Sequence, residues 1–138
     1  MYSVVVDVDT SGRETVDLTD ELLSFCEGNG DGLCSVFVPH ATAGVALMET
    51  GSGSEEDLSE ALGRLLPRHA AYRHRHGAPG HGADHLLPAL VSPSLVVPVF
   101  GGRPALGTWQ RLVLVDRNAD NPQRRVRFSF LPDARPPA

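Results

Sequence analysis

The chain has 138 residues, 41% of them hydrophobic and 21% charged, a composition typical of one globular domain, which we expect to span residues 1–138. Its net charge of −5 argues against nucleic-acid binding, which needs a basic surface, and no apolar run is long enough to cross a membrane. All twelve basic residues are arginines, so Schiff-base chemistry on a lysine is excluded.

Alternating apolar and polar residues predict several strands in the first half of the chain. These strands are expected at residues 2–8, 14–18, 33–38 and 45–49. The first two are expected to pair as a hairpin across a turn at residues 10–12. Thr19 is the predicted N-cap of a helix that ends near Glu27. A longer helix, with one apolar stripe, is expected from about Ser54 to Pro67.

The second half of the chain is predicted to be mostly β. Strands are expected at residues 94–100, 108–115 and 126–130, and a short helix is expected from about Asp84 to Val91. Strands and helices do not alternate regularly, which argues against a doubly wound parallel fold. We therefore predict an α+β fold: a single domain with a mostly antiparallel or mixed β-sheet packed with two to three helices.

Histidines are concentrated in one loop, because five of the six lie between residues 69 and 85. Imidazole is the commonest metal ligand, and a catalytic zinc typically takes three protein ligands. His74 and His85 from this loop, with His40 from a strand end, could supply that set. No CxxC motif is present, and a solvated histidine-rich loop without fixed geometry is the alternative interpretation.

The stretch from Gly102 to Gln110 is the second candidate site. Glycines permit a ligand to approach the backbone closely, Arg103 and Thr108 could bind an anion, and Gln110 could orient it. The stretch is not a P-loop, since the lysine and the spacing are missing. The alternative is a tight turn whose Trp109 packs in the core.

Two features of the sequence bear on the cellular compartment of the protein. Cys26 and Cys34 do not make a disulfide framework, and the start of the chain lacks both the basic segment and the long apolar stretch of a signal peptide. We therefore expect a reduced, cytoplasmic protein in which Cys34 is buried on its strand.

The same residues resemble a known family over nearly the whole chain. The matching elements are His40-Ala41-Thr42-Ala43-Gly44, Glu49, Tyr72-Arg73-His74, His85, Gly102-Arg103 and Gly107-Thr108-Trp109-Gln110. They are similar to the YjbQ-like family, often called secondary thiamine-phosphate synthases. The spacing between the histidines and the Gly-Thr-Trp-Gln stretch is the most specific part of this resemblance.

The resemblance implies a compact α+β domain that assembles as a homotrimer, with a cleft at subunit interfaces lined by His40, Glu49, His74 and His85. It also implies a divalent metal of the zinc type and a weak thiamine-phosphate synthase activity, which joins a pyrimidine pyrophosphate to a thiazole phosphate. The leading hypothesis is a metal-dependent enzyme. His40, His74 and His85 would bind the metal, and Glu49 would act as a general base or as a partner of the ligands. The phosphate of a small substrate would bind Arg103 and Thr108.

Several positions depart from the family pattern. The family usually has Thr-Ser where Ala41-Thr42 stands, Asn-Glu-Asn where Met48-Glu49-Thr50 stands, and an acidic pair where Gly80-His81 stands. Metal binding could therefore persist while catalysis is altered, and His81 could replace a lost carboxylate as a ligand. The alternative hypotheses are a catalytically silent trimer that binds a metal or a phosphorylated metabolite, and a structural trimer with a surface histidine loop.

Overall fold

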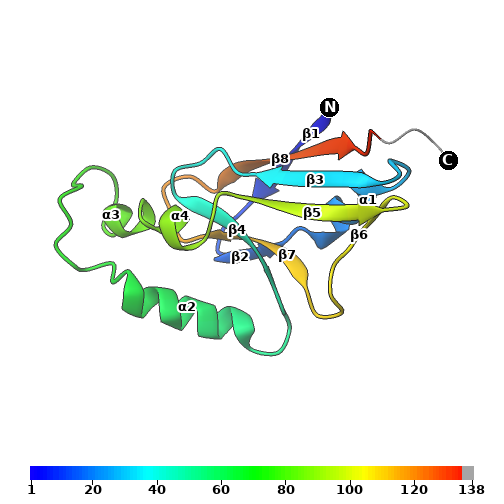
Figure 1. Ribbon diagram of the computed structural model, residues 1–138. Coiled ribbons are helices and arrows are strands. Elements are labelled where there is room, and N and C mark those ends of the chain that lie inside the picture. The colour runs from blue at the N-terminus through cyan, green and yellow to red at the C-terminus, as the bar shows by residue number, and fades with distance from the viewer. Residues whose placement is uncertain (135–138) are drawn as a thin grey trace.

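Two antiparallel sheets form the framework of the structure, a computed structural model that describes residues 1–134 (Figure 1). Sheet A has the strand order β1-β8-β3-β5-β6, and sheet B has the order β2-β7-β4. The strands of sheet A are β1 (Tyr2–Asp9), β8 (Gln123–Pro132), β3 (Gly32–Phe37), β5 (Ser94–Phe100) and β6 (Arg103–Pro104). Those of sheet B are β2 (Thr15–Asp17), β7 (Arg111–Asp116) and β4 (Ala43–Met48).

The main core lies between the two sheets. Val36 of β3 and Phe128 of β8 face Leu112 and Leu114 of β7, and all four side chains are fully buried. Helix α1 (Thr19–Cys26) contributes the buried Leu22 to the same core. Because side chains alternate along a strand, the opposite face of β7 carries a second set of apolar residues.

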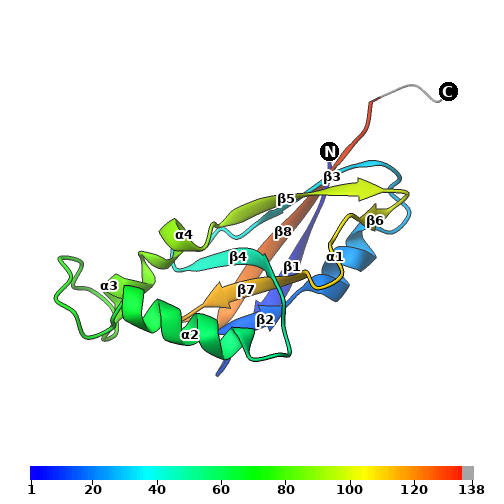
Figure 2. The same ribbon diagram turned by 60° about the horizontal axis from the view of Figure 1, so that its bottom comes forward.

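Three helices cover that opposite face of sheet B: α2 (Ser54–Leu65), α3 (His81–Asp84) and α4 (Leu87–Leu90). Leu62 of α2, Ala83 of α3 and Leu87 of α4 pack against Val113 and Val115 of β7 in a second apolar cluster. Figure 2 shows α2 lying along sheet B on the side away from sheet A. The layers are therefore sheet A, sheet B and the helices, and no helix formed by residues 1–134 covers the outer face of sheet A.

One expectation about strand pairing was wrong. The strand at 2–8 does not pair with the strand at 14–18, since β1 pairs with β8 and β2 pairs with β7. The consecutive strands β3 and β4 likewise belong to different sheets. In both cases the chain passes from one sheet to the other through a connection with exposed residues, such as Gly12 and Ala41. Local alternation predicts a strand but carries no information about its partner.

Two element boundaries also differ. The helix expected over 84–91 is two short helices, and Pro88, which has no N–H, lies in the first turn of the second. The strand expected from Thr108 begins only at Arg111, and the preceding residues form a turn in which the Gln110 side chain accepts the Gly107 N–H. Trp109 in that turn is 73% exposed, which excludes the alternative that it packs in the core.

The predicted fold class is confirmed: one α+β domain with antiparallel sheets and packed helices. Cys34 is buried on β3, as expected. None of the helices in residues 1–134 is long and apolar enough to cross a bilayer. The cytoplasmic location stays a prediction.

Candidate functional site

The histidine loop follows α2 and is held by one arginine. Arg68 pairs with the buried carboxylate of Asp84, and the same guanidinium donates to the Pro79 and Arg117 carbonyls. Tyr72 Oη donates to the Pro67 carbonyl at 2.8 Å. These bonds connect the start of the loop to α3 at its end and to the segment after β7. A glycine- and proline-rich stretch that would be mobile alone is thus attached to the framework at several points.

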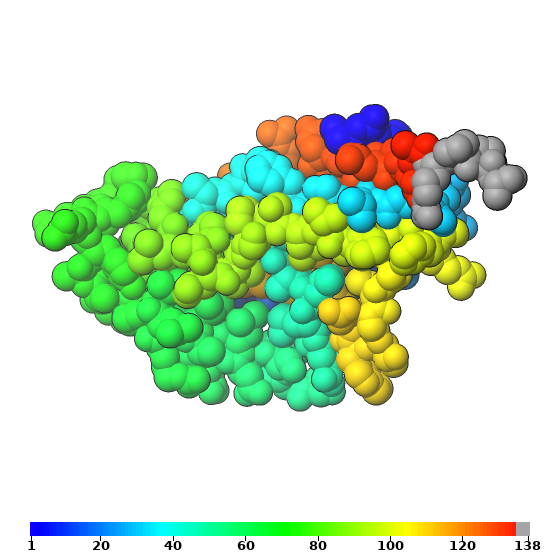
Figure 3. Space-filling view, in the orientation of Figure 1, coloured from blue at the N-terminus to red at the C-terminus, as the bar shows by residue number. Residues whose placement is uncertain are grey.

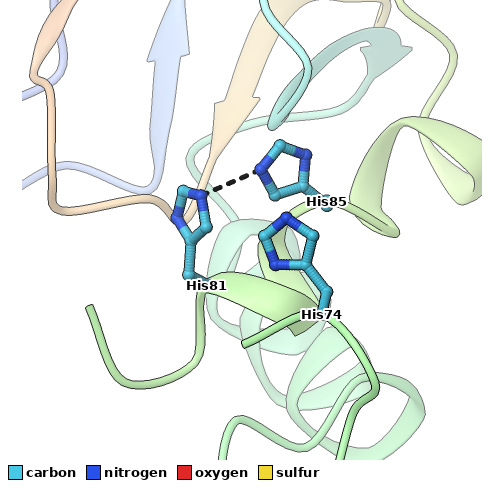
Figure 4. A group of neighbouring side chains, drawn as sticks. All are labelled: His74, His81 and His85. Carbon is cyan, nitrogen blue, oxygen red and sulfur yellow. Dashed lines mark hydrogen bonds between the residues drawn. The ribbon is translucent and has the colours of Figure 1, made fainter. Parts of the chain in front are cut away.

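Three imidazoles converge at the end of this loop: His74, His81 and His85 (Figure 4). One ring nitrogen from each lies within 4.8 Å of the others. The Nε2 atoms of His81 and His85 are 2.9 Å apart, and the ring of His74 lies 4.5 Å from that of His85 between centroids. Helix α3 explains part of this geometry, because residues four apart lie on one helix face. His81 begins that helix and His85 follows it.

The convergence leaves ring nitrogens without ordinary partners. Nδ1 of His74 is buried and has no hydrogen-bond partner among the described residues. Nδ1 of His81 is 3.0 Å from a carboxylate oxygen of Asp120, although the angle is not that of a hydrogen bond. A buried polar atom without a partner costs free energy unless a ligand binds it. The donor set of three imidazoles therefore fits a divalent metal, and one ring nitrogen of each histidine would hold it.

The electrostatics of the cluster favour the neutral form of two of its imidazoles, those of His74 and His85. Burial lowers the pKa of His74, and the neighbouring His76, His85 and His81 lower it further because like charges repel. Burial also lowers the pKa of His85, with additional effects of His81 and His76, while Asp84 opposes the shift. Neutral imidazole is the form that binds a metal.

These pKa shifts predict that the metal-free protein loses stability in acid. The folded pKa of His74 and of His85 lies below the unfolded value of about 6.5, so the folded state binds fewer protons. Their contribution to the free energy of unfolding is therefore full above about pH 6.5 and is lost as the pH falls from there through the folded pKa values. Urea unfolding at a series of pH values measures this. A His74→Gln/His85→Gln variant should show a shallower acid loss, and an unchanged slope would contradict the assignment.

His40 and Glu49 lie outside this cluster. His40 precedes β4, and its Nε2 accepts the backbone N–H of Arg125 at 2.9 Å. Burial and the nearby Arg124 lower the pKa of His40. Glu49 is exposed directly after β4. The strand between them has six residues, so at about 3.3 Å per residue they lie about 20 Å apart in one chain.

The predicted anion-binding residues lie at the other end of the molecule. Arg103 is exposed on β6, Thr108 is exposed in the following turn, and the Gln110 side chain is engaged by Gly107 N–H. Figure 3 shows the histidine loop, in green, projecting at one end, whereas the yellow segment after β6 lies toward the other. Figures 1 and 2 agree on this separation. Within one chain, the two groups cannot contact the same small ligand.

Two features of the cluster could not be assigned from the sequence. His81 was named only as a possible replacement ligand, and its four-residue spacing from His85 was the available signal. Asp120 was not among the candidate site residues. The chain brings it to the loop from the β7–β8 connection, where it accepts the Ala78 N–H at 3.3 Å in addition to contacting His81.

Comparisons with known proteins agree on one family. The family model described as UPF0047 protein YjbQ-like matches residues 5–133. A UPF0047 protein of Mycobacterium tuberculosis is 66% identical over 131 residues, which cover 95% of this chain and 98% of the relative. A solved hypothetical protein from Aeropyrum pernix has a TM-score of 0.87 and 31% identity over 96% of this chain and 100% of its own. A YbjQ-like protein of unknown function from Sulfolobus solfataricus has a TM-score of 0.88 and 26% identity over 96% of this chain and 97% of its own.

Proposed function

Because the chain belongs to the YjbQ-like UPF0047 family, we propose that it is a small metal-dependent enzyme acting on a phosphorylated small molecule. The divalent metal, of the zinc type, binds the imidazoles of His74, His81 and His85. The observation that carries this proposal is the convergence of three imidazoles around a buried Nδ1 of His74 that has no partner in residues 1–134. Three protein ligands with an open position are typical of catalytic rather than structural zinc.

Within one chain, His81 takes the place in this ligand set that the sequence suggested for His40. The Nε2 of His40 already accepts a backbone N–H, whereas His81 directs its Nε2 toward His85. The Asp120 carboxylate beside Nδ1 of His81 favours a proton on that nitrogen, which leaves Nε2 free to bind the metal. A carboxylate in this position also makes the imidazole a stronger ligand.

Replacing Asp120 by asparagine is expected to weaken zinc affinity by about 10- to 100-fold, because the amide cannot balance the charge of a metal-bound His81. Isothermal titration with zinc measures the change. The matched control is Asp57→Asn on the exposed side of α2, which should leave the affinity unchanged. Equal affinities in the Asp120 and Asp57 variants would rule out a role for Asp120.

The residues expected to bind phosphate require a second subunit if they are to share this site. Arg103 and Thr108 are too far from the histidines in one chain, so the homotrimer implied by the resemblance forms part of the proposal. The outer face of sheet A supports it. Six apolar side chains are exposed there, at Val5, Leu33, Phe37, Val96, Phe100 and Leu131. Exposed apolar faces of this kind mark protein interfaces. Sedimentation equilibrium should give the mass of three chains, and a monomer at all concentrations would exclude the shared site.

In this arrangement each residue has a defined task. Arg103 and Thr108 bind the substrate phosphate, Gln110 supports the turn that presents Thr108, and Glu49 is the candidate general base. A bound divalent metal supplies Lewis-acid stabilisation of negative charge, such as that of a pyrophosphate leaving group. His40 and the neighbouring exposed Arg125 remain available to orient an anionic substrate at the subunit boundary.

The reaction to test is the coupling of a pyrimidine pyrophosphate to a thiazole phosphate, with zinc-loaded wild-type protein and its His85→Ala variant. Product formed by the wild-type protein above the variant's background supports the enzyme. The second candidate function is a catalytically silent trimer that binds a metal or a phosphorylated metabolite. It is favoured by the ligand set itself, because a histidine stands where the family usually has an acidic residue. Stoichiometric metal without any product would favour this second function.

A further inference from the structure

A groove runs between the edge strand of sheet A and helix α1, and the histidine cluster contributes no residue to it. It encloses about 730 Å³. Its apolar lining comes from alternate residues of β1 and one aromatic side chain of α1: Tyr2, Val4, Val6 and Phe25. The rings of Tyr2 and Phe25 are stacked, with centroids 5.3 Å apart. We call this feature the β1–α1 groove.

Strand β1 leaves one side of its backbone without a partner strand in residues 1–134. It is the first strand in the order of sheet A, and it pairs only with β8, in an unbroken register from Tyr2 to Asp9. Proteins usually protect such an edge with a lysine, a proline or a bulge. None of these interrupts Tyr2–Val6, which is rich in valine. The edge can therefore accept a further strand.

The rim of the groove is acidic. Asp20, Glu21 and Glu27 of the α1 segment line it, and no basic side chain of residues 1–134 does. None of these three carboxylates makes a salt bridge among the described residues. A second copy of this chain placed edge to edge on β1 would bring two such rims together. Charge complementarity therefore favours a basic partner over self-association.

We propose that the β1–α1 groove binds an extended, arginine- or lysine-rich peptide segment of a partner protein, which adds a strand beside β1. Backbone hydrogen bonds to the open edge supply affinity, as in other cases of strand addition. Alternate side chains of the added strand point into the groove. A long basic side chain there lays its aliphatic stem on Val4, Val6 and Phe25 and reaches the carboxylates with its charged end. The proposal is independent of the metal site.

The test uses the full chain and a fluorescein-labelled peptide of alternating arginine and valine, eight residues long like β1. Fluorescence anisotropy should show saturable binding. A peptide with glutamate in place of arginine, and one with a central proline that cannot pair with an edge, should bind much more weakly. Slower hydrogen exchange of β1 amides on binding should accompany the anisotropy change. Unchanged exchange in β1, or equal binding of the proline peptide, would overturn the proposal.

Matched variants test whether the carboxylates on the groove rim bind the peptide. Glu21→Gln/Glu27→Gln on the groove rim should raise the dissociation constant about fivefold or more, since each exposed ion pair contributes modestly. Glu56→Gln/Glu60→Gln on α2 removes the same charge away from the groove and should change it less than about twofold. Equal effects of the two double variants would mean that net charge alone attracts the peptide, and would refute the proposal. An absence of peptide binding would refute it as well, and so would dimerisation of the protein through β1.

Discussion

Replacing His85 by alanine is expected to abolish stoichiometric zinc binding. The loss of zinc affinity should exceed the roughly hundredfold that can follow from removing a residue that only hydrogen-bonds to a metal ligand. The physical reason is geometric. The Nε2 of His85 faces that of His81 at 2.9 Å and its ring lies beside that of His74, so one substitution removes the imidazole that lies next to both others. Metal analysis of the purified variant and calorimetric titration measure the loss.

The matched control for this substitution is His69→Ala, because His69 is an exposed histidine at the start of the same loop. It should retain full metal content. A replacement ligand is also within reach, since the ring of His76 lies 3.9 Å from that of His74 between centroids. The double variant His76→Ala/His85→Ala removes this route. Stoichiometric zinc in the double variant would disprove the assignment of His85 as a ligand.

Replacing Asp116 by alanine is expected to lower the free energy of unfolding by about 3–5 kcal/mol, which is the cost of leaving a buried charge unpaired. Asp116 on β7 pairs with Arg124 on β8, and their side chains are 0% and 4% exposed. The same guanidinium donates to Thr42 Oγ1 at 3.2 Å, and Asp116 also accepts the Asn118 N–H. This pair therefore joins both sheets to the segment that carries His40.

Urea unfolding of two further variants separates burial from simple charge loss. Arg111→Ala removes the ion pair with Asp17, which is largely exposed, and should cost less than about 1 kcal/mol. Asp116→Ala/Arg124→Met removes both buried charges and should recover most of the stability lost in the single variant. If Asp116→Ala costs no more than Arg111→Ala, the pair does not stabilise the fold as described.

Local patterns were sufficient for most elements of this fold. The strand predicted at 94–100 has those bounds in the structure, and the helix predicted from Ser54 ends at Leu65, just before Pro67. Pairing was harder to predict. β1 and β2 look like a hairpin because a turn separates two strand-like segments, yet their partners are β8 and β7, near the other end of the chain. Which sheet a strand joins depends on contacts between distant residues, and periodicity does not report them.

The candidate site, too, was only partly predictable from local patterns. A histidine-rich loop was visible in the sequence, and the structure places His74 and His85 of that loop side by side. His81 completes the group because a short helix begins at that residue, whereas the sequence predicted one short helix from about Asp84 to Val91. Asp120 reaches the loop from the connection between β7 and β8, 35 or more residues later than the histidines, so no local motif could indicate it. The metal and the role of His40 remain proposals.

Zinc K-edge X-ray absorption of the wild-type protein loaded with one equivalent of zinc tests the three-histidine centre most directly. Three imidazole ligands with zinc–nitrogen distances of about 2.0–2.1 Å, together with one oxygen ligand from water, are the predicted result. The imidazole signal should fall in His74→Ala, His81→Ala and His85→Ala, and it should be unchanged in His40→Ala. A spectrum with fewer than two imidazoles, or one that changes only in His40→Ala, would contradict a metal centre at this cluster.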